Sequence, residues 1–391
     1  MSIVRKGHIP YAPTGIGQYV DELYTIKGFF GDWAHIYRKH NLAHPTSLSN
    51  EALIYSGIDS GVITAPDKDD ANGAPLSLLV GDGVAISLSQ RSALMPFAEK
   101  NADFHQIRFY HQGRYTLDTE LGSMEVEAGD FVAIPKGLIY RETPAAAGGV
   151  ILIFEVADPI QLAERLWDQV GFTSLFVDYS RAEVPSPTSA GDGEVNHETR
   201  VRVKYRGEYH SMEYDFDPCH DVVGWLGDPI LFKLNVWQIP GIGTTSGFLP
   251  PPANAVLFSE EKSFFFNVLG PRPMPTSPPP DASYGAPSHL NDYDEVWFNH
   301  SAELAPDTNG HLWFFPPTVP HPGLKRPAEY PPNPVRQVRE MKLNFDTSSA
   351  LHWTPEAKEI LMPDPQVAVY TSFYGAHVGV VPEAVTRYAK R

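Results

Sequence analysis

The sequence has few of the features that mark several large classes of protein. Its 391 residues include a single cysteine, Cys219, so that no disulfide can form within the chain. That composition is typical of a reducing compartment. Lysine and arginine number 30 against 47 aspartates and glutamates, which gives a net charge of −17. A chain this acidic lacks the positive surface that non-specific binding to nucleic-acid phosphates requires.

Long apolar runs are also missing. No segment of the sequence approaches the roughly 18 apolar residues of a membrane span. Residues 1–11 carry Arg5, Lys6 and Pro10 where a signal peptide would have an apolar core. The sequence therefore predicts a soluble, unprocessed and cytoplasmic protein with neither a membrane nor a nucleic acid among its partners.

Proline, by contrast, is in excess. It accounts for 37 residues, about 9.5% of the chain, against a usual share of about 5%. Proline disrupts helix interiors and central strands, and here it lies between short apolar and aromatic stretches. Because long amphipathic patterns are scarce, the composition favours an all-β protein with long connections.

Short β-type runs separated by turn residues support this interpretation, since such spacing is typical of antiparallel sandwiches or barrels. The predicted strands are residues 78–80, 84–86, 107–111, 114–119, 122–126, 130–135 and 150–156, with a second series over residues 201–319. Helices are predicted only at residues 159–170, where Asp158 can act as the N-cap, and at residues 382–391.

Two blocks of the sequence recur in the same order. Residues 129–140 and 310–321 both consist of a glycine, five residues, a proline, four residues and a ring-bearing side chain. Upstream, residues 100–106 align with residues 289–295. The repeat predicts two β modules, an N-terminal one over residues 1–180 and a C-terminal one over residues 181–391.

The C-terminal copy of the repeat carries three residues of metal-ligating type, His289, Glu295 and His321. An Asn-Asp pair between the first two predicts a turn that would let both point inward from adjoining strands, with His321 coming from a third. Two neutral imidazoles and one carboxylate form a facial triad, which leaves open positions on iron(II) for substrate and oxygen. The alternative is that these are ordinary polar residues on strand surfaces.

The aligned positions of the N-terminal copy are Lys100, Gln106 and Tyr140, none of which is a usual iron ligand. The sequence therefore predicts one metal ion per chain, bound by the C-terminal module and not by the N-terminal module.

At these positions the chain resembles the cupins, and more closely the homogentisate 1,2-dioxygenase family of bicupins. The resemblance lies in residues 27–32 and 37–40, in the stretch Asp221-Val-Val-Gly-Trp-Leu-Gly227, and in His289-x5-Glu295 followed by Pro320-His321. It implies an all-β bicupin fold and an Fe(2+)-dependent enzyme that opens an aromatic ring with O₂. It also implies a homo-oligomer, which the exposed strand edges of two open modules would favour.

The departures from the family pattern concern the substrate pocket. Leu226 and Phe315 stand where the family has histidines. Pro287 and Ser288 stand where the family has tyrosines beside the first metal ligand. An apolar side chain can neither relay a proton nor bind a carboxylate, so we expect weak cleavage of homogentisate and a different phenol as the substrate.

His220 and His300 are the candidates to replace the family's acid–base histidine, and Trp297 is a candidate for the pocket wall. The expected partners are thus a small aromatic substrate and O₂. Two alternatives remain open. One is another metal-dependent cupin enzyme, an isomerase or hydrolase that uses Zn²⁺, Mn²⁺ or Ni²⁺. The other is a non-catalytic binding bicupin without a metal.

Overall fold

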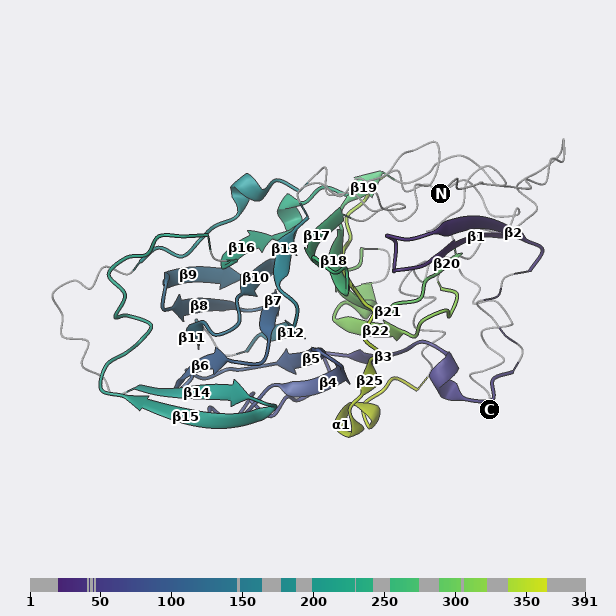
Figure 1. Cartoon of the computed structure of the whole chain (residues 1–391). Coiled ribbons are helices and arrows are strands. Elements are labelled where there is room, and N and C mark those ends of the chain that lie inside the picture. Colours follow the sequence, from purple (N-terminus) through teal and green to yellow (C-terminus); the bar gives the residue numbers. More distant parts are fainter. Residues whose placement is uncertain are drawn as a thin grey trace.

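The computed structural model describes most of the chain and is built almost entirely from strands (Figure 1). The described residues are 20–40, 42, 45, 47–145, 148–163, 177–187, 199–228, 230–241, 254–273, 288–303, 306–321 and 337–363. Their helices are α1 (Pro355–Lys358) and short 3₁₀ turns at Glu51–Leu53, Tyr179–Arg181, Val236–Gln238 and Pro306–Thr308. None of these helices has the length and apolar character needed to span a membrane.

The N-terminal module is a sandwich of two sheets. Its seven-stranded sheet has the order β16 (Phe232–Asn235), β10 (Asp130–Ile134), β7 (His105–Gln112), β12 (Val150–Val156), β5 (Val84–Ser89), β4 (Leu76–Gly81) and β25 (His352–Trp353). Its six-stranded sheet has the order β15 (Glu208–Tyr214), β14 (Thr199–Tyr205), β6 (Ala98–Asn101), β11 (Ile139–Pro144), β8 (Arg114–Thr119) and β9 (Gly122–Glu127). Alternate residues of the two sheets, such as Val132 and Leu117, meet in a shared apolar core.

The C-terminal module packs a second seven-stranded sheet against smaller ones. The large sheet has the order β13 (Ile160–Leu162), β17 (Asn254–Ser259), β18 (Phe264–Leu269), β24 (Met341–Thr347), β21 (Asp294–Ser301), β22 (His311–Phe315) and β3 (Ser56–Asp59). The smaller sheets are β2 (Trp33–Arg38), β1 (Val20–Thr25) and β20 (Ser288–Leu290), and the pair β19 (Arg272–Pro273) and β23 (Gln337–Val338).

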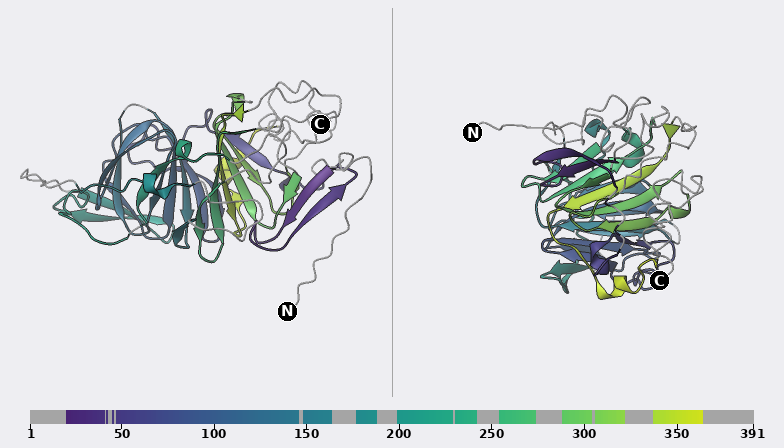
Figure 2. Two further views of the ribbon diagram at one scale, coloured as in Figure 1. Left: turned by 90° about the horizontal axis from the view of Figure 1, so that it is seen from above. Right: turned by 90° about the vertical axis from the view of Figure 1, so that its right-hand side faces the viewer.

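The two modules lie side by side and share one core between their seven-stranded sheets (Figure 2). Phe154 of the N-terminal sheet contacts Phe266 and Phe345 of the C-terminal sheet, with ring centroids 5.5 and 5.2 Å apart. Apolar area removed from water, together with aromatic contacts, holds the sheets together. Residues of β21 therefore alternate between this shared core and the interior of the C-terminal module, which places the site described below.

Several strands pair outside their own half of the sequence. β1 and β3 pair with β20 and β22 of the C-terminal module, while β14 and β16 pair with β6 and β10 of the N-terminal module. The boundary near residue 180 stays a prediction. The pairing shows that each module is completed by segments from the other side of that boundary.

The expected all-β fold is confirmed, and the predicted strands near residues 78–156 are all present. β8 and β12 have the predicted bounds of 114–119 and 150–156. The predicted helix at residues 159–170 is wrong at its start, because residues 160–162 form β13 and pair with β17. The open edge of the large sheet offers this segment backbone partners, and that pairing overrides its helical pattern. Residues 164–170 and 382–391 lie outside the described part of the chain.

The sequence repeat corresponds to an equivalent strand register in the two modules. Gly129 and Gly310, with φ of 94° and 85°, each immediately precede a five-residue strand. Gln106 is then paired with Ile134, just as Glu295 is paired with Phe315. The sequence alignment of residues 100–106 with residues 289–295 is shifted by one residue at its first position, because Glu99 and not Lys100 pairs with Tyr140. The comparable pair in the C-terminal module is His289 and His321.

Candidate metal centre

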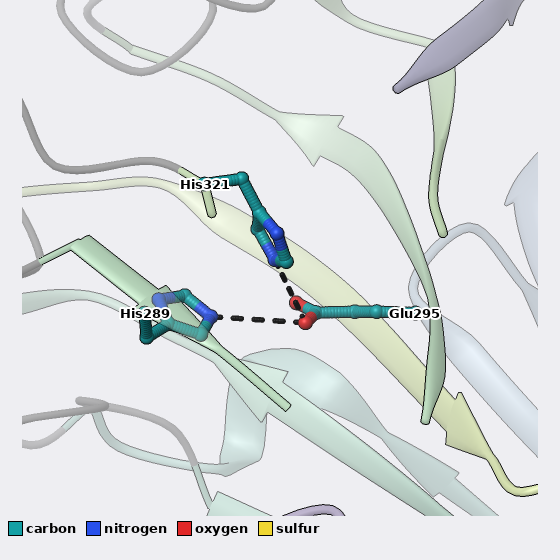
Figure 3. Close-up of side chains that lie close together, drawn as sticks. All are labelled: His289, Glu295 and His321. Carbon is teal, nitrogen blue, oxygen red and sulfur yellow. Dashed lines mark hydrogen bonds and ion pairs between the residues drawn. The ribbon is translucent and has the colours of Figure 1, made fainter. Parts of the chain in front are cut away.

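His289, Glu295 and His321 come together in the interior of the C-terminal module (Figure 3). One ligand atom from each residue lies within 4.8 Å of the other two, and all three side chains are buried. The Nε2 atoms of His289 and His321 lie 3.7 and 2.9 Å from Oε2 of Glu295. Among the described residues, this is the group of metal-ligating side chains that could hold an ion.

Backbone pairing positions the two imidazoles. His289 and His321 form an antiparallel bridge, in which each backbone N–H donates to the carbonyl oxygen of the other at 2.9 Å. The strand that carries His289 is in turn paired with β1 in parallel, with Leu23 as the partner of His289. The N-terminal strand thus fixes a ligand that lies more than 260 residues away in the sequence.

The turn between the first two ligands has the expected Asn-Asp chemistry. The Asn291 side chain accepts a hydrogen bond from the Tyr293 N–H at 2.8 Å. Asp292 accepts one from the N–H of Gly28 at 3.0 Å, which ties the turn to the β1–β2 connection. Gly28 has a φ of 58°, and a Cβ there would lie 2.6 Å from the Phe265 ring, so that only glycine fits this contact.

Glu295 is a buried carboxylate that its neighbours keep ionised. Burial would raise its pKa, but the charge of His321 and hydrogen bonds from both histidines hold the pKa of Glu295 below its ordinary value. Trp297, two residues along the same strand, donates its indole N–H to the other carboxylate oxygen. The carboxylate is therefore held by its partners on both oxygens.

The hydrogen bonds of His321 indicate where its proton lies. Nδ1 of His321 is 2.7 Å from the carbonyl oxygen of Val319, which can only accept, so Nδ1 carries a hydrogen. In the neutral ring Nε2 is then a lone pair that faces Oε2 of Glu295 at 2.9 Å. Two acceptors at this distance need a proton or a cation between them. The donor set and its orientation thus fit a divalent metal ion.

Aromatic rings enclose the histidines. Phe315 stacks on His321 with ring centroids 4.1 Å apart and an interplanar angle of 20°. Phe29 lies against His289 at 5.8 Å. Both phenylalanines are fully or almost fully buried. The cluster therefore has apolar walls on the sides of both imidazoles.

Asp346 is a buried carboxyl group beside the cluster that the sequence did not single out. It is the cross-strand partner of Glu295 on β24. Burial and, after it, the charge of Glu295 raise the pKa of Asp346 well above its ordinary value. The alternation along β24 could have found it, because Lys342, Asn344 and Asp346 are polar in a strand whose other face is apolar.

Of the other predicted pocket residues, Phe315 and Trp297 lie against the cluster, as the contacts above show. Ser288 belongs to β20, next to the first ligand in the sequence. Pro287 lies outside the described residues. Leu226 does not line this site within the chain, because its side chain is fully exposed and the adjacent Trp225 donates to the carbonyl of Leu121 in the N-terminal module. Residues 221–228 are mostly exposed, so the segment follows the protein surface there.

Neither candidate acid–base histidine contacts the cluster. His220 pairs with Asp217 at 3.1 Å, beside Asp118 of β8 in the N-terminal module. His300 lies on the other side of β21 and contacts Phe109 and His111 across the shared core. Burial lowers the pKa of His300 to about 4. The expectation that these two residues serve the substrate finds no support within the single chain, because strand alternation turns His300 to the opposite face from Glu295.

The equivalent place in the N-terminal module is filled by a different set of groups. Arg108 donates to the Gln106 side chain at 3.4 Å, to the Tyr140 hydroxyl at 3.2 Å and to Glu142 at 2.9 Å. The Tyr140 hydroxyl donates in turn to Glu99 at 2.7 Å. A guanidinium group thus supplies the positive charge at this centre.

Two packed β-sandwich modules, one with a buried His–Glu–His cluster at its centre, define a cupin-type protein with a candidate metal centre. Comparison with known families agrees, since residues 74–236 match the family model described as the N-terminal part of homogentisate 1,2-dioxygenase. The chain is thus similar to the homogentisate 1,2-dioxygenases over a part of its length that is somewhat less than half.

Its similarity to individual relatives is low. The homogentisate 1,2-dioxygenase of Pseudomonas putida strain GB-1 is 28% identical over 180 residues, which is 44% of this chain and 38% of that protein. A candidate dioxygenase of Saccharolobus solfataricus is 24% identical over 312 residues, covering 76% of this chain and 77% of that protein. The matched part thus spans well under half the length of the named homogentisate dioxygenase.

Solved structures that match this chain include a deletion mutant of Bacillus subtilis oxalate decarboxylase. It is 10% identical and covers 88% of this chain and 90% of its own, with a TM-score of 0.35. The Ylba protein of Escherichia coli is also 10% identical and covers 76% of this chain and 88% of its own, with a TM-score of 0.35. The fold assignment rests on the strand order of the two modules.

Proposed function

We propose that this protein is an Fe(2+)-dependent dioxygenase that cleaves the ring of a hydroxylated aromatic compound. The observation that carries the proposal is the convergence of His289, Glu295 and His321 on one point inside a cupin-type module. The family relationship supports the choice of reaction. The donor set of two imidazoles and one carboxylate supports the choice of iron(II) over metals that prefer thiolate or all-oxygen sites.

Iron(II) held by these three residues would supply Lewis-acid and redox chemistry for ring opening, with positions left for a phenolate and O₂. The protein's own contribution is orientation. The Val319 carbonyl keeps the hydrogen of His321 on Nδ1 and so directs Nε2 toward Glu295. Trp297 holds one carboxylate oxygen, which limits how Glu295 can turn. A preorganised site of this kind lets proximity supply much of the rate enhancement.

The walls of the site bear on which phenol is taken. Phe315 places an apolar ring flat against His321, and it offers neither a proton nor a hydrogen bond to a substrate carboxylate. We therefore expect a neutral hydroxylated aromatic to be a better substrate than homogentisate, which carries an acetate arm. Losing a positioned general base typically costs about 10²- to 10⁴-fold in rate, and neither His220 nor His300 lies against the cluster to replace the family's histidine.

Oxygen uptake tests this proposal directly. The protein is loaded anaerobically with Fe(II) and then screened with catechol, hydroquinone, their carboxylic acids and homogentisate. We expect at least one neutral phenol to reach a kcat/KM of roughly 10⁴ M⁻¹s⁻¹, with homogentisate well below it. If Glu295→Gln consumes oxygen as fast as the wild type, the cluster is not the active site. If the protein retains Zn²⁺, Mn²⁺ or Ni²⁺ in place of iron and is active only with that metal, it is a different kind of cupin enzyme.

We also propose that the protein forms a homo-oligomer. β15 is the edge strand of its sheet and is exposed along nearly its whole length, with Tyr209 and Met212 among its exposed side chains. An unpaired edge of this kind is a template for association. Light scattering at micromolar concentration should give a mass that is a multiple of 43.3 kDa. A mass equal to one chain would rule the proposal out.

A further inference from the structure

The strand that carries the first metal ligand is paired with a hairpin from the other end of the chain. Strands β1 and β2 with their connection, residues 20–38 and called here the N-terminal hairpin, lie at the edge of the C-terminal module away from the N-terminal module (Figures 1 and 2). β20 has only three residues, and its neighbour in the sheet is β1. A single bridge joins it to His321 as well. Because so short a strand is marginal without its neighbours, β1 contributes to the position of His289.

The inner face of the N-terminal hairpin packs into the apolar cluster around the metal ligands. Leu23 and Phe29 belong to the same group of buried residues as Trp297 and Phe315. The Phe29 ring is 1% exposed and lies against the His289 ring, with the two ring centroids 5.8 Å apart. The hairpin therefore supports the first ligand twice, through the backbone pairing of Leu23 and through the ring of Phe29.

An aspartate in the turn between the first two metal ligands contacts the connection that carries Phe29. Asp292 accepts a hydrogen bond from the N–H of Gly28 at 3.0 Å, and Gly28 directly precedes Phe29 in the chain. Lys27 and Gly28 have φ values of 53° and 58°, a backbone conformation that is unfavourable for a lysine. A strained turn of this kind persists through the contacts that surround it, and the hydrogen bond to Asp292 is one of them.

The N-terminal hairpin has the features of a unit that opens locally. β2 is the edge strand of its sheet, and its side chains are exposed or half-buried along the whole strand. An ion pair between Arg38 and Glu22, at 2.6 Å, joins the two strands of the hairpin to each other. Segments with few buried contacts open at a lower free energy than the body of a protein. Opening would remove the support of His289 and leave both sandwiches folded.

We infer that metal binding at the candidate metal centre and docking of the N-terminal hairpin are coupled, and that Asp292 is a positioning residue for His289. The inference rests on the proposed function and deepens it, because it specifies how the metal centre is held closed. The docked hairpin keeps His289 where a divalent ion needs it, and a bound ion keeps His289 where the hairpin docks. Such coupling is reciprocal, so each event strengthens the other by the same factor.

Hydrogen exchange of the hairpin amides tests the coupling without any turnover. The full-length wild type is compared in the metal-free state and at a Zn²⁺ concentration about a hundred times its dissociation constant. If opening of the hairpin releases the ion completely, exchange of residues 20–38 slows by about 100-fold, and we expect a slowing of at least about tenfold. The exposed edge strand β15 is the internal control and should exchange equally fast in both samples. Glu295→Gln should remove the effect of Zn²⁺.

Asp292→Ala tests the positioning residue. Loss of the hydrogen bond to Gly28 should lower the affinity for Zn²⁺ by about three- to tenfold, measured by competition with a chelator. Exchange of residues 20–38 should become faster in the metal-free protein. Asp292→Asn keeps a side-chain oxygen that can accept from Gly28 and should restore most of the affinity. This variant separates the effect of the hydrogen bond from that of the negative charge.

Asp103→Ala is the matched control in the N-terminal module. Asp103 also accepts a hydrogen bond from a glycine that is distant in the sequence, the N–H of Gly207 at 2.8 Å. That turn likewise has two positive φ values, 52° at Arg206 and 78° at Gly207. Because this contact is far from the metal ligands in the fold, Asp103→Ala should leave the affinity for Zn²⁺ unchanged.

The outcomes separate this inference from the proposed function. Slower hairpin exchange with Zn²⁺, together with weaker binding in Asp292→Ala but not in Asp103→Ala, supports the coupling even if no oxygen is ever consumed. Zn²⁺ binding that leaves the exchange of residues 20–38 unchanged overturns the coupling, and this measurement on the wild type decides even if Asp292→Ala does not fold. Full affinity in Asp292→Ala, or affinity in Asp292→Asn as low as in Asp292→Ala, overturns the role of Asp292. In each of these cases a dioxygenase would still stand, whereas a wild type that binds no divalent metal overturns both.

Discussion

The centres of the two modules differ although their strands have equivalent register. In the N-terminal module the central side chains bind one another, with Arg108 bonded to Gln106, Tyr140 and Glu142. In the C-terminal module Nε2 of His321 faces the Glu295 carboxylate at 2.9 Å, and with the ring hydrogen on Nδ1 a proton or a cation must lie between these two atoms. The same scaffold therefore carries two kinds of centre. In the N-terminal module an arginine side chain supplies the positive charge, whereas the C-terminal module needs a proton or a bound cation.

The charge state of Arg108 fits its structural role. Burial opposes a charged group, but Glu142 and the nearby tyrosines and Glu99 raise the pKa of Arg108 well above its ordinary value. Because the guanidinium stays charged, it balances the carboxylates permanently. The C-terminal centre has no such permanent cation, and an ion must take that place for Glu295 to be balanced without protonating a histidine.

The largest effect is expected from the metal ligands. His289→Ala, Glu295→Ala and His321→Ala should each abolish iron binding while the sheets stay folded, because each removes one of three converging donors. The loss of iron affinity should exceed the change of about 10- to 100-fold that is typical when a hydrogen-bond partner of a metal ligand is removed. Inductively coupled plasma analysis after anaerobic loading measures it. If one of these variants retains its full iron content, the residue replaced in it is not a metal ligand.

The opposite result is expected in the N-terminal module. Arg108→Met should lower the free energy of unfolding by about 3–5 kcal/mol, because it leaves the buried Glu142 without its ion-pair partner and with the neutral Tyr110 hydroxyl as a donor. Iron content should not change. Arg114→Met is the matched control, since its ion pair with Glu127 is exposed and worth at most about 1 kcal/mol. Equal destabilisation by the two variants would contradict the structural role assigned to Arg108.

A smaller effect is expected behind the metal ligands. Trp297→Phe keeps an aromatic ring but removes the N–H that holds Glu295. Iron affinity should fall by about 10- to 100-fold, measured by competition with a chelator of known affinity. Trp237→Phe, which alters a half-exposed tryptophan away from the cluster, should leave iron affinity unchanged. If the iron affinity of Trp297→Phe equals that of the wild type, the indole contributes packing and its hydrogen bond to Glu295 does not affect metal binding.

The smallest effect concerns the shared core and depends on pH. Burial lowers the pKa of His111 to about 3 and of His300 to about 4, from an ordinary value of 6.5. The unfolded chain therefore takes up these protons first as the pH falls, and stability present above about pH 6.5 is lost progressively down to about pH 3. His111→Gln should flatten this decline in urea denaturation curves, whereas His210→Gln on the exposed strand β15 should not. Equal slopes for both variants would exclude the histidine pair as the cause.

Much of the fold could be predicted because its determinants are local. Turn glycines and alternating apolar residues mark the strands, and the repeat marks two modules with equivalent registers. The helix predicted from residue 159 is wrong at β13, because β13 pairs with β17 and this pairing joins residues about 100 positions apart. The same limit applies to β1, whose pairing with β20 no local pattern announces.

The candidate site was predictable to the extent that its chemistry is concentrated in rare residue types. His289, Glu295 and His321 stand out by type and spacing. Asp346 does not, because its place beside Glu295 follows from the pairing of β21 with β24, which no local pattern specifies. The resemblance places Leu226 in the pocket, and His300 is a candidate to replace the family's acid–base histidine. The exposure of Leu226 and the contacts of His300 across the shared core come from the tertiary structure.

The central claim is that the C-terminal centre holds one metal ion and the N-terminal centre holds none. Anomalous scattering at the iron edge from crystals grown with Fe(II) under anaerobic conditions tests it most directly. The account predicts one peak per chain, within coordination distance of His289, Glu295 and His321. A peak beside Gln106 and Tyr140, or a fully loaded crystal with no peak at the three ligands, would contradict it.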